Sequence, residues 1–575
     1  MNIYSVDPPG LRRRGAKGGR TAAALALAFL AVPGASAALA QSAPPTERPS
    51  GDKPASAGEG RSADEDPKWG ASLDFEGKAG TRRHLGEADL FVPLLQDERT
   101  LLFANARFRF DDDSSREGNL GLGVRRMVGG GWNLGAYGYF DRRRSENDHY
   151  FNQATFGVEA LGRDFDARAN LYLPFGERIK TVDSLNTATL SGTSVVFRGG
   201  EERAIPGFDA EVGWRVPVFD ADSPHEFRLY AGGYRFDDPA VEAVAGPRLR
   251  AELTAYDVPQ LWHGARVTLG AEWQHDEPRG GQAFFSARLR IPLHSEARRS
   301  RHLTAQERRM TAPVVRDVDI VAQAGDFGAP ETVTETASGQ TLSVLSSDST
   351  TGAALPGTVA AAGADSTVVL SGTFTTTAAT VLQSGQTLMG AGSVAVRSPS
   401  GRTATLTTPA ATINAAVPIV GTNATVTLAS NTTLTGLNLT NSVGGGNAAI
   451  GVAGDNVTGI TITNNAISST TTGNGVIGMR LTGTVTGVVS DNTITATTVP
   501  GQTATAFATS GVGAKTLTVS GNTITATGGT TNNAVNVSNA IFNAGSTGNV
   551  LGGGACVDSG GNTGSISFTN GATCP

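Results

Sequence analysis

The sequence predicts an all-β protein in two parts, an N-terminal 12-stranded antiparallel transmembrane β-barrel followed by a C-terminal parallel β-helix (solenoid). Three observations predict this fold class. Twelve segments between residues 68 and 293 alternate apolar and polar side chains with a period of two. From residue 336 onward only nine residues are charged, five acids and four bases. In this C-terminal part, strand-like runs contain asparagines spaced 24, 27 and 30 residues apart, a period typical of solenoids.

The composition excludes two classes of protein. The 575 residues carry a net charge of −6 and a sequence pI near 5.7, whereas a nucleic-acid-binding protein usually presents a basic patch and a high pI. No apolar run reaches the roughly 20 residues of a membrane-spanning helix. A helical membrane protein is therefore excluded. A membrane barrel is not, because its strands alternate and keep the mean hydropathy low.

The first forty residues are typical of a secretory signal peptide. Basic residues precede an apolar core at residues 21–32, and small residues precede the expected cleavage between Ala40 and Gln41. A short membrane anchor is the alternative, although the apolar run is short for one. Residues 41–66 are rich in Pro, Ser, Asp and Glu, and we expect them to form a disordered periplasmic arm.

Residues 67–294 are predicted to form the barrel. Phe165 and the alternate residues after it are apolar, whereas Asp166 and Arg168 lie on the opposite face. In most segments one face carries Arg, Glu, Asp and Gly and the other carries Ala, Leu, Phe and Trp, as expected of a polar lumen and a lipid-facing surface. The longest connection, residues 175–204, falls on the outer side. A soluble β-sandwich is the alternative.

Four runs within the barrel carry a family resemblance. They are residues 118–126 (GNLGLGVRR), 132–141 (WNLGAYGYFD), 156–160 (FGVEA) and 170–174 (NLYLP). Their order and spacing resemble the β-domain of inverse autotransporters (intimin/invasin-like), over roughly residues 66–322. The resemblance implies an outer-membrane barrel, a linker that runs up through its lumen, and a C-terminal passenger at the cell surface, as in type V secretion.

Residues 295–330 match the lumenal linker of that family. Its arginines would pair with acids on the lumen wall, and an exposed basic helix is the alternative. The arginines are Arg298, Arg299, Arg301, Arg308 and Arg309, and the acids are Asp74, Glu76, Glu211 and Glu252. The chain shows no peptidoglycan-binding module, immunoglobulin-like repeats or lectin-like tip, so adhesion through those tips is not implied.

Residues 331–575 are predicted to be the β-helical passenger. Thr, Val and Ile favour strands, and asparagine tolerates the tight corners between them. The pattern resembles a right-handed parallel β-helix of eight or nine coils, in which stacked asparagines form a ladder. The asparagines expected in this ladder are Asn441, Asn465, Asn492 and Asn522. A disordered Thr-rich stalk and a β-sandwich are the alternatives.

The two cysteines, Cys556 and Cys574, lie in the last twenty residues. Because export favours oxidation, we expect a structural disulfide that locks the end of the solenoid. Two free thiols are the alternative. No metal site is expected, since the passenger contains no histidine.

Catalysis is not expected. Glycoside hydrolysis needs two carboxylates at a fixed separation. Between residues 370 and 575 only Asp455, Asp491 and Asp558 are acidic, and the first two could fall on neighbouring coils. We interpret both as turn residues, and we expect no catalytic residue, cofactor or metal. The alternative is a barrel-anchored β-helical carbohydrate-active enzyme.

The sequence thus predicts an outer-membrane inverse autotransporter that displays an adhesin or interaction rod. The expected partners are outer-membrane lipid, the barrel-assembly machinery, and an extracellular receptor or glycan of unknown identity, with no nucleic acid. A porin-like barrel that carries a periplasmic solenoid is a further alternative.

Overall fold

The computed structural model describes residues 68–220, 223–258, 261, 264–293, 303–317, 319–415, 423–442 and 448–575. The predicted signal peptide, its cleavage site between Ala40 and Gln41, and the predicted periplasmic arm lie outside the described residues. Within the described residues, no helix is long and apolar enough to cross a membrane.

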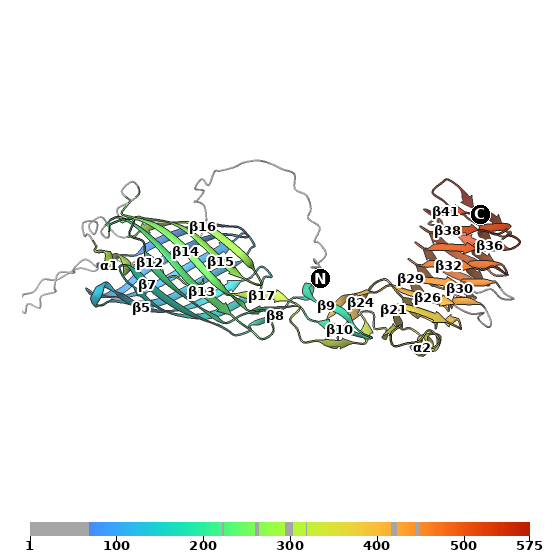
Figure 1. Ribbon diagram of the computed structural model, residues 1–575, viewed down its shortest axis with the longest axis horizontal. Coiled ribbons are helices and arrows are strands. Elements are labelled where there is room, and N and C mark those ends of the chain that lie inside the picture. The colour runs from blue at the N-terminus through green and yellow to red at the C-terminus, as the bar shows by residue number, and fades with distance from the viewer. Residues whose placement is uncertain are drawn as a thin grey trace, which may run out of the picture. The chain divides into compact units, whose positions relative to one another are not determined.

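Twelve strands close into an antiparallel barrel, as the alternation predicts (Figure 1). The strands are β1 (Ser72–Gly80), β2 (His84–Gln96), β3 (Thr100–Asp111), β4 (Arg116–Met127), β5 (Asn133–Arg144), β6 (Tyr150–Leu161), β7 (Phe165–Phe175), β12 (Gly207–Arg215), β13 (His225–Phe236), β14 (Val244–Tyr256), β15 (Arg266–Asp276) and β16 (Gly280–Pro292). The first strand pairs with the last, from Ser72 opposite Pro292 to Gly80 opposite Phe284, so the sheet has no open edge.

The two faces of the barrel differ as the sequence pattern requires. In β3, Phe108 and Phe110 are about half exposed on the outside, whereas Arg107 and Arg109 between them are buried in the lumen. An apolar outer surface matches lipid, and closure of the sheet satisfies every strand's backbone hydrogen bonds where no water is present. The charged residues in the middle of this strand therefore face the lumen.

The long outer connection between β7 and β12 is itself folded. It contains β8 (Ile179–Thr181), β9 (Thr187–Ser191), β10 (Ser194–Arg198) and β11 (Glu201–Ala204). A three-stranded sheet joins β8, β11 and the later strand β17 (Ala322–Gly325). A six-stranded sheet has the order β18-β10-β9-β25-β24-β19, and its other members are β18 (Glu331–Val333), β19 (Glu335–Thr336), β24 (Gly392–Arg397) and β25 (Thr403–Thr408).

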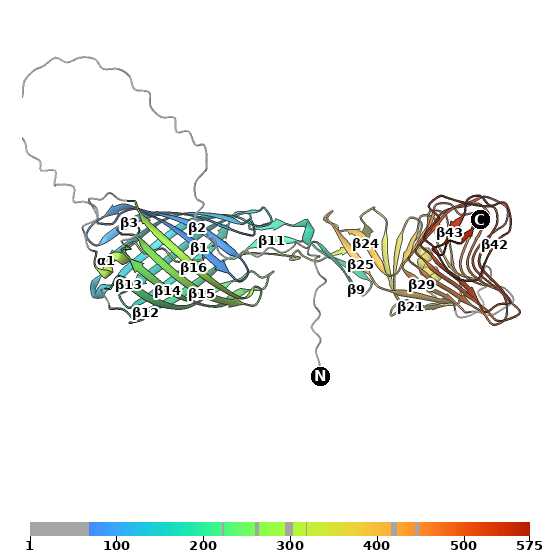
Figure 2. The same ribbon diagram turned by 90° about the horizontal axis from the view of Figure 1, so that it is seen from above.

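The passenger is a parallel solenoid with three faces (Figures 1 and 2). One face stacks β20 (Leu342–Ser346), β21 (Thr367–Thr376), β23 (Thr387–Met389), β28 (Thr433–Thr435), β31 (Ile460–Thr463), β34 (Val485–Ser490), β37 (Lys515–Ser520) and β40 (Ala540–Phe542). The second stacks the end of β21 with β26 (Ala411–Ala415), β29 (Leu437–Asn441), β32 (Ala466–Thr470), β35 (Thr493–Thr497), β38 (Thr523–Thr527) and β41 (Val550–Gly553). The third stacks β22 (Thr380–Val381), β27 (Ala424–Thr427), β30 (Ala449–Asp455), β33 (Val476–Thr482), β36 (Thr503–Ser510), β39 (Thr531–Val537) and β42 (Ala555–Asp558).

The solenoid has about seven coils rather than the expected eight or nine, since its third face holds seven strands. The difference has a structural reason. Residues 331–336 and the hairpin of β24 and β25 lie within the predicted β-helical passenger, but they belong to the six-stranded sheet with β9 and β10. A short helix, α2 (Leu355–Ala361), buries Leu355 and Val359 against the first coils.

The interior of the solenoid is a continuous apolar stack. Leu434, Ile462, Val489 and Val519 pair in register from one coil to the next, and all four are fully buried. Each coil covers the apolar surface of the coil before it, so burial is shared along the whole stack. The passenger therefore needs a covered first coil and a covered last coil.

A ladder of buried asparagines runs along one corner of the solenoid. The ladder consists of Asn465, Asn492, Asn522 and Asn549, which lie on successive coils. From Asn492 onward, each Oδ1 accepts two hydrogen bonds from the previous asparagine, one from its backbone N–H and one from its side-chain Nδ2. These bonds are 2.9–3.1 Å long. Each residue before them has a positive φ, for example Asn464 with φ 57°. That turn points the next side chain inward.

The prediction for Asn441 was wrong, while Asn549 extends the ladder. Asn441 lies at the far end of β29, where its Nδ2 donates to the carbonyls of Asn423 and Ile450 at 2.8 Å. The equivalent corner position in that coil is Leu437, whose backbone N–H donates to Asn465 Oδ1 at 3.1 Å. The ladder therefore begins at Asn465.

Replacing Asn492 by leucine should destabilise the passenger by at least about 2 kcal/mol, because it leaves several buried backbone and amide partners unsatisfied. Urea unfolding of the full chain in detergent, followed by protease sensitivity of the passenger, measures the change. Asn464→Gly is the matched control, since glycine already holds the equivalent turn at Gly521 and Gly548. Equal stability of N492L and N464G would show that the ladder adds nothing.

Candidate functional site

The lumen of the barrel is occupied by the chain that follows its last strand. A short helix, α1 (Ala305–Arg309), begins this segment and is capped by Thr304 and Glu307 in a reciprocal capping box. Trp69 Nε1 donates to the Glu307 carbonyl at 2.9 Å, and Gln306 Nε2 donates to the Trp132 carbonyl at 3.1 Å. Because Trp132 lies in an inner turn, α1 is at the inner end of the barrel.

Beyond α1, the linker runs through the lumen without a strand partner over residues 310–317. Arginines on the wall bind its backbone carbonyls instead. Arg125 Nη1 donates to Met310 and Ala312 at 2.9 and 2.6 Å, and Arg107 Nη2 donates to Val314 at 2.9 Å. A buried carbonyl without a partner is costly, so the wall arginines replace the hydrogen bonds that a neighbouring strand would supply.

The charges of the linker are paired with the wall along its path. Arg309 Nη2 donates to both oxygens of Asp166, and Arg316 Nη2 lies 2.9 Å from Asp141 Oδ1. Further along, Asp319 contacts Arg109 Nη1 at 3.2 Å. Removing one partner of such a buried pair strands a charge, so these pairs fix the position of the linker more than they add to stability.

The predicted arginines and acids meet different partners from those expected. Arg298, Arg299 and Arg301 lie outside the described residues. Arg308 stacks on Tyr256, with its guanidinium 4.8 Å from the ring centroid. Only Arg309 forms the expected kind of ion pair among the described predicted arginines, with Asp166 and also with Glu226 at 3.3 Å.

The four predicted acids bind wall arginines instead of the linker. The pairs are Asp74 with Arg290, Glu76 with Arg288, Glu211 with Arg168 and Arg250, and Glu252 with Arg250. Most of these partners face the lumen from neighbouring strands. The acids of the barrel wall are therefore neutralised by arginines of the wall and not by the linker. Asp166 is the acid that binds Arg309. The alternation of β7 already placed Asp166 on the lumen side, and this was the only hint of the pairing in the sequence.

Among the described residues, little open space remains beside the linker in the lumen. A cavity of about 130 Å³ remains beside the linker, lined by charged side chains that include Arg248, Arg250 and Glu272. Ligand pockets are typically larger, roughly 300–1,000 Å³. The linker then leaves the lumen on the outer side, where Arg143 Nη1 donates to the Ile320 carbonyl at 2.5 Å and β17 pairs with β11.

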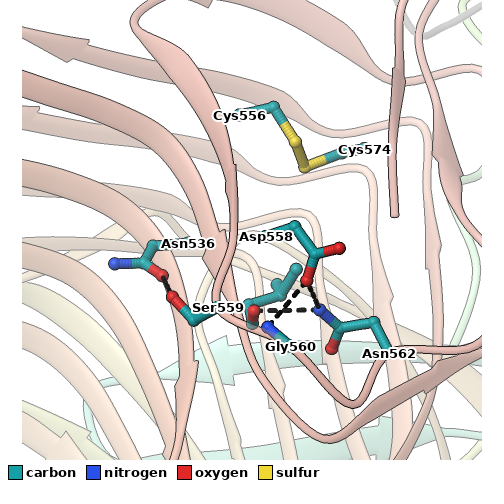
Figure 3. Close-up of a disulfide and its surroundings, with 8 residues drawn as sticks. Asn536, Cys556, Asp558, Ser559, Gly560, Asn562 and Cys574 are labelled. Carbon is teal, nitrogen blue, oxygen red and sulfur yellow. Dashed lines mark hydrogen bonds between the residues drawn. A yellow bond between two sulfur atoms is a disulfide. The ribbon is translucent and has the colours of Figure 1, made fainter.

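The far end of the passenger is covered by its last residues. Ile566, Phe568 and Cys574 are buried on the apolar stack, and β43 (Ile566–Ser567) pairs with β44 (Thr573–Cys574). Cys574 forms a disulfide with Cys556 in β42, with the Cα atoms 5.7 Å apart (Figure 3). The turn between them is held by Asp558, whose Oδ1 accepts from Gly560 N and Asn562 Nδ2 at 2.8 and 2.6 Å.

The two candidate carboxylates lie on different corners of the solenoid. Asp455 ends β30 and its Oδ1 accepts from the Thr482 hydroxyl at 2.7 Å. Asp491 stands between β34 and β35 in the left-handed conformation, with φ 58°. Both are exposed turn residues. The structure therefore does not bring them together as an acid–base pair.

These features define a class of protein: a membrane barrel whose own chain returns through its lumen and continues as a separate β-helical domain on the other side. Comparison with known proteins adds the family. Residues 68–224 match the family model described as inverse autotransporter, beta-domain. The N-terminal barrel is thus an inverse autotransporter β-domain, and the protein is an outer-membrane barrel with a surface-displayed passenger.

Known structures resemble the barrel at low identity. A membrane protein described in a study of in-meso crystallisation is 16% identical, covers 44% of this chain and 100% of its own, and has a TM-score of 0.33. The β-domain of the Bordetella autotransporter BrkA is 14% identical over 38% of this chain and 97% of its own, with a TM-score of 0.21. The translocator domain of NalP from Neisseria meningitidis is 12% identical over 40% and 90%, with a TM-score of 0.21. No curated protein matches the chain.

Loss of the linker's ion pairs should open the lumen. In planar bilayers, we expect an R309A/R316A variant to be open at least about tenfold more often than the parent, because two buried charge pairs no longer hold the linker. Arg116 and Arg126 are exposed on β4, so R116A/R126A is the matched control. Equal conductance of both variants and the parent would show that these pairs do not hold the linker in place.

Breaking the disulfide should loosen only the end of the passenger. In the chain-entropy model, closing a loop of this length, with a sequence separation of 18, contributes about 3 kcal/mol. We expect C556S/C574S to raise amide hydrogen exchange in β39 and β42 while leaving β30 unchanged. Reduction of the parent should reproduce the effect, and unchanged exchange in β42 would contradict it.

Proposed function

We propose that the displayed passenger is an adhesin or interaction rod and that it recognises an uncharged, hydroxyl-rich ligand such as a glycan, or a receptor surface of similar chemistry. The observation that carries the proposal is the outer surface of the second solenoid face. It presents a regular array of threonine side chains with no charged residue among them.

The array follows from the register of the coils. Thr493, Thr495 and Thr497 in β35 stand opposite Thr523, Thr525 and Thr527 in β38. The alternate residues, among them Ile494 and Ile524, are fully buried. Strands of a sheet lie about 4.8 Å apart, so the hydroxyls repeat at that spacing along the stack.

A surface of this kind favours certain ligands. Without charges it gives no long-range steering and little salt-dependent attraction. Recognition must then rest on hydrogen bonds and on contact with the threonine methyl groups. Glycans supply hydroxyl donors and acceptors at regular intervals, which supports a glycan or a receptor surface of like chemistry as the partner.

The enzyme alternative has less support. Hydrolysis needs two carboxylates held on opposite sides of one bond, and Asp455 and Asp491 occupy different corners of the solenoid. The inverse autotransporter β-domain acts as an anchor for display, which supports binding as the role of the passenger. The barrel-assembly machinery and outer-membrane lipid remain proposed partners of the barrel.

Placing charge on the threonine array should abolish adhesion without affecting display. Cells that express T495K/T525K should lose at least about tenfold in binding to an array of neutral glycans, because each lysine desolvates poorly at a hydrogen-bonded contact. A tag placed after Pro575 and detected by antibody on intact cells verifies display.

The matched control is V488K/T518K, which adds the same charges to the outer side of the first face, on β34 and β37. It should adhere like the parent. Failure of the displayed parent to bind any array surface would contradict the adhesin proposal, and equal loss in both variants would remove the second face as its binding surface.

A further inference from the structure

The six-stranded sheet beside the first coils combines the barrel with the passenger. Its second and third strands, β10 and β9, come from the outer loop of the barrel, and its other four strands come from the passenger. Figure 2 shows β9 beside β24 and β25. The passenger therefore does not complete this sheet by itself.

The outer loop is held in place by bonds among its own residues. β9 and β10 form a hairpin from Ser191 opposite Ser194 to Thr187 opposite Arg198. At its base, Gly200 N donates to Asn186 Oδ1 at 2.9 Å, and Val182 N donates to the Gly200 carbonyl at 2.9 Å. These contacts need no passenger residue, so the hairpin can be formed before the passenger arrives.

One face of this hairpin is apolar and is covered by the passenger. Val195 and Phe197 are buried to 2% and 0% exposure, in a cluster with passenger residues that include Val344, Val369 and Leu406. Fully burying a side chain of this type is worth about 1.5–3 kcal/mol. The same contacts cover Val344 and Val369, which lie on the outer side of the first solenoid face, in the row that continues to Met389.

Both edges of the hairpin are occupied by passenger strands. β18 adds to β10, with Val333 opposite Val195, and β25 adds to β9, with Leu406 opposite Ala188. An exposed strand edge offers a row of unpaired N–H and C=O groups and therefore templates the addition of further strands.

A polar contact fixes the hairpin of β24 and β25 on the same loop. Arg402 Nε donates to Asp183 Oδ1 at 2.8 Å, and Arg402 Nη2 donates to Asn186 Oδ1 and to the Gly200 carbonyl at 2.6 and 2.9 Å. Asp183 and Asn186 lie at the base of the hairpin. A single passenger side chain thus binds the loop at three points.

The order of the chain brings these contacts together early. The linker stays in the lumen and leaves it along β11, so residues 331–336, at the start of the passenger, are the passenger residues nearest the pore. Only five residues separate β17 from β18, which makes the entropic cost of docking β18 small. The first passenger segment outside the barrel therefore meets the hairpin before any coil is complete.

We propose that the β9–β10 hairpin of the barrel is the template on which the passenger begins to fold, and that it then remains packed on the outer side of the first solenoid face, beside the first coils. The partner it fits is the segment 331–408 of the same chain. This inference rests on display of the passenger and goes beyond it, since it assigns a folding role to an outer loop of the anchor.

The test follows the passenger of the full-length protein on intact cells after synthesis is stopped. A V195D/F197D variant should gain protease resistance of its passenger at least about tenfold more slowly than the parent, since substitutions in a folding nucleus slow folding. The matched control is T189D/S194D, which adds the same charges at exposed positions of the same hairpin. It should fold at the parental rate.

Two further measurements keep the outcomes distinct. Heat-modifiable mobility in a gel reports assembly of the barrel, and antibody against a tag after Pro575 reports emergence of the passenger. If the barrel of V195D/F197D fails to assemble, the R402A variant replaces it. This variant removes a passenger side chain that binds the loop, and its passenger should also fold more slowly than that of the parent. Parental folding kinetics in V195D/F197D, or in R402A where that variant replaces it, would overturn the template. A parent whose tag stays hidden would instead overturn display.

Discussion

The structure depends on one constraint, that every backbone N–H and C=O removed from water must find a partner. In the wall of the barrel the pairing of β1 with β16 meets it, since no strand is left with an open edge toward lipid. In the lumen, where the linker has no strand neighbour, Arg125 and Arg107 meet it by binding the carbonyls of the linker. In the passenger each coil serves as the hydrogen-bonding partner of the next.

The distribution of charge follows from the same constraint. Buried charges are tolerated only where they are paired, and the lumen offers a continuous lattice of such pairs, with Arg168 between Asp166 and Glu211 as one example. The solenoid interior offers no such lattice. Apart from Lys515, whose Nζ donates to the Gly511 carbonyl at 2.6 Å, its buried polar side chains are amides and hydroxyls. The buried ladder from Asn465 to Asn549 satisfies itself from coil to coil.

The periodicity of the sequence made the fold predictable. The contacts between distant residues could not be predicted in this way. The alternation of Arg107 with Phe108 places one side chain in the lumen and the other toward lipid whatever their partners are. The acid that pairs with Arg309 is set by how β7 lies beside a linker more than 100 residues away in the sequence. The periodic pattern of the sequence contains no information about that pairing. Likewise, Asn441 has the local sequence of a ladder residue, but its place within β29 puts it at another corner. The pairing of β18, β19, β24 and β25 in one sheet with β9 and β10 reduced the number of coils for the same reason.

The cover on each end of the solenoid has a consequence for the cell surface as a whole. A parallel stack of coils ends in rows of unpaired strand edges, and such edges are the growing points of fibrils. Here α2 buries Leu355 and Val359 against the first coils, and the segment closed by Cys556 and Cys574 covers the other end. Covered ends of this kind oppose the addition of one copy to another, because neither end of the stack offers an open apolar coil to a neighbouring copy on a crowded outer membrane.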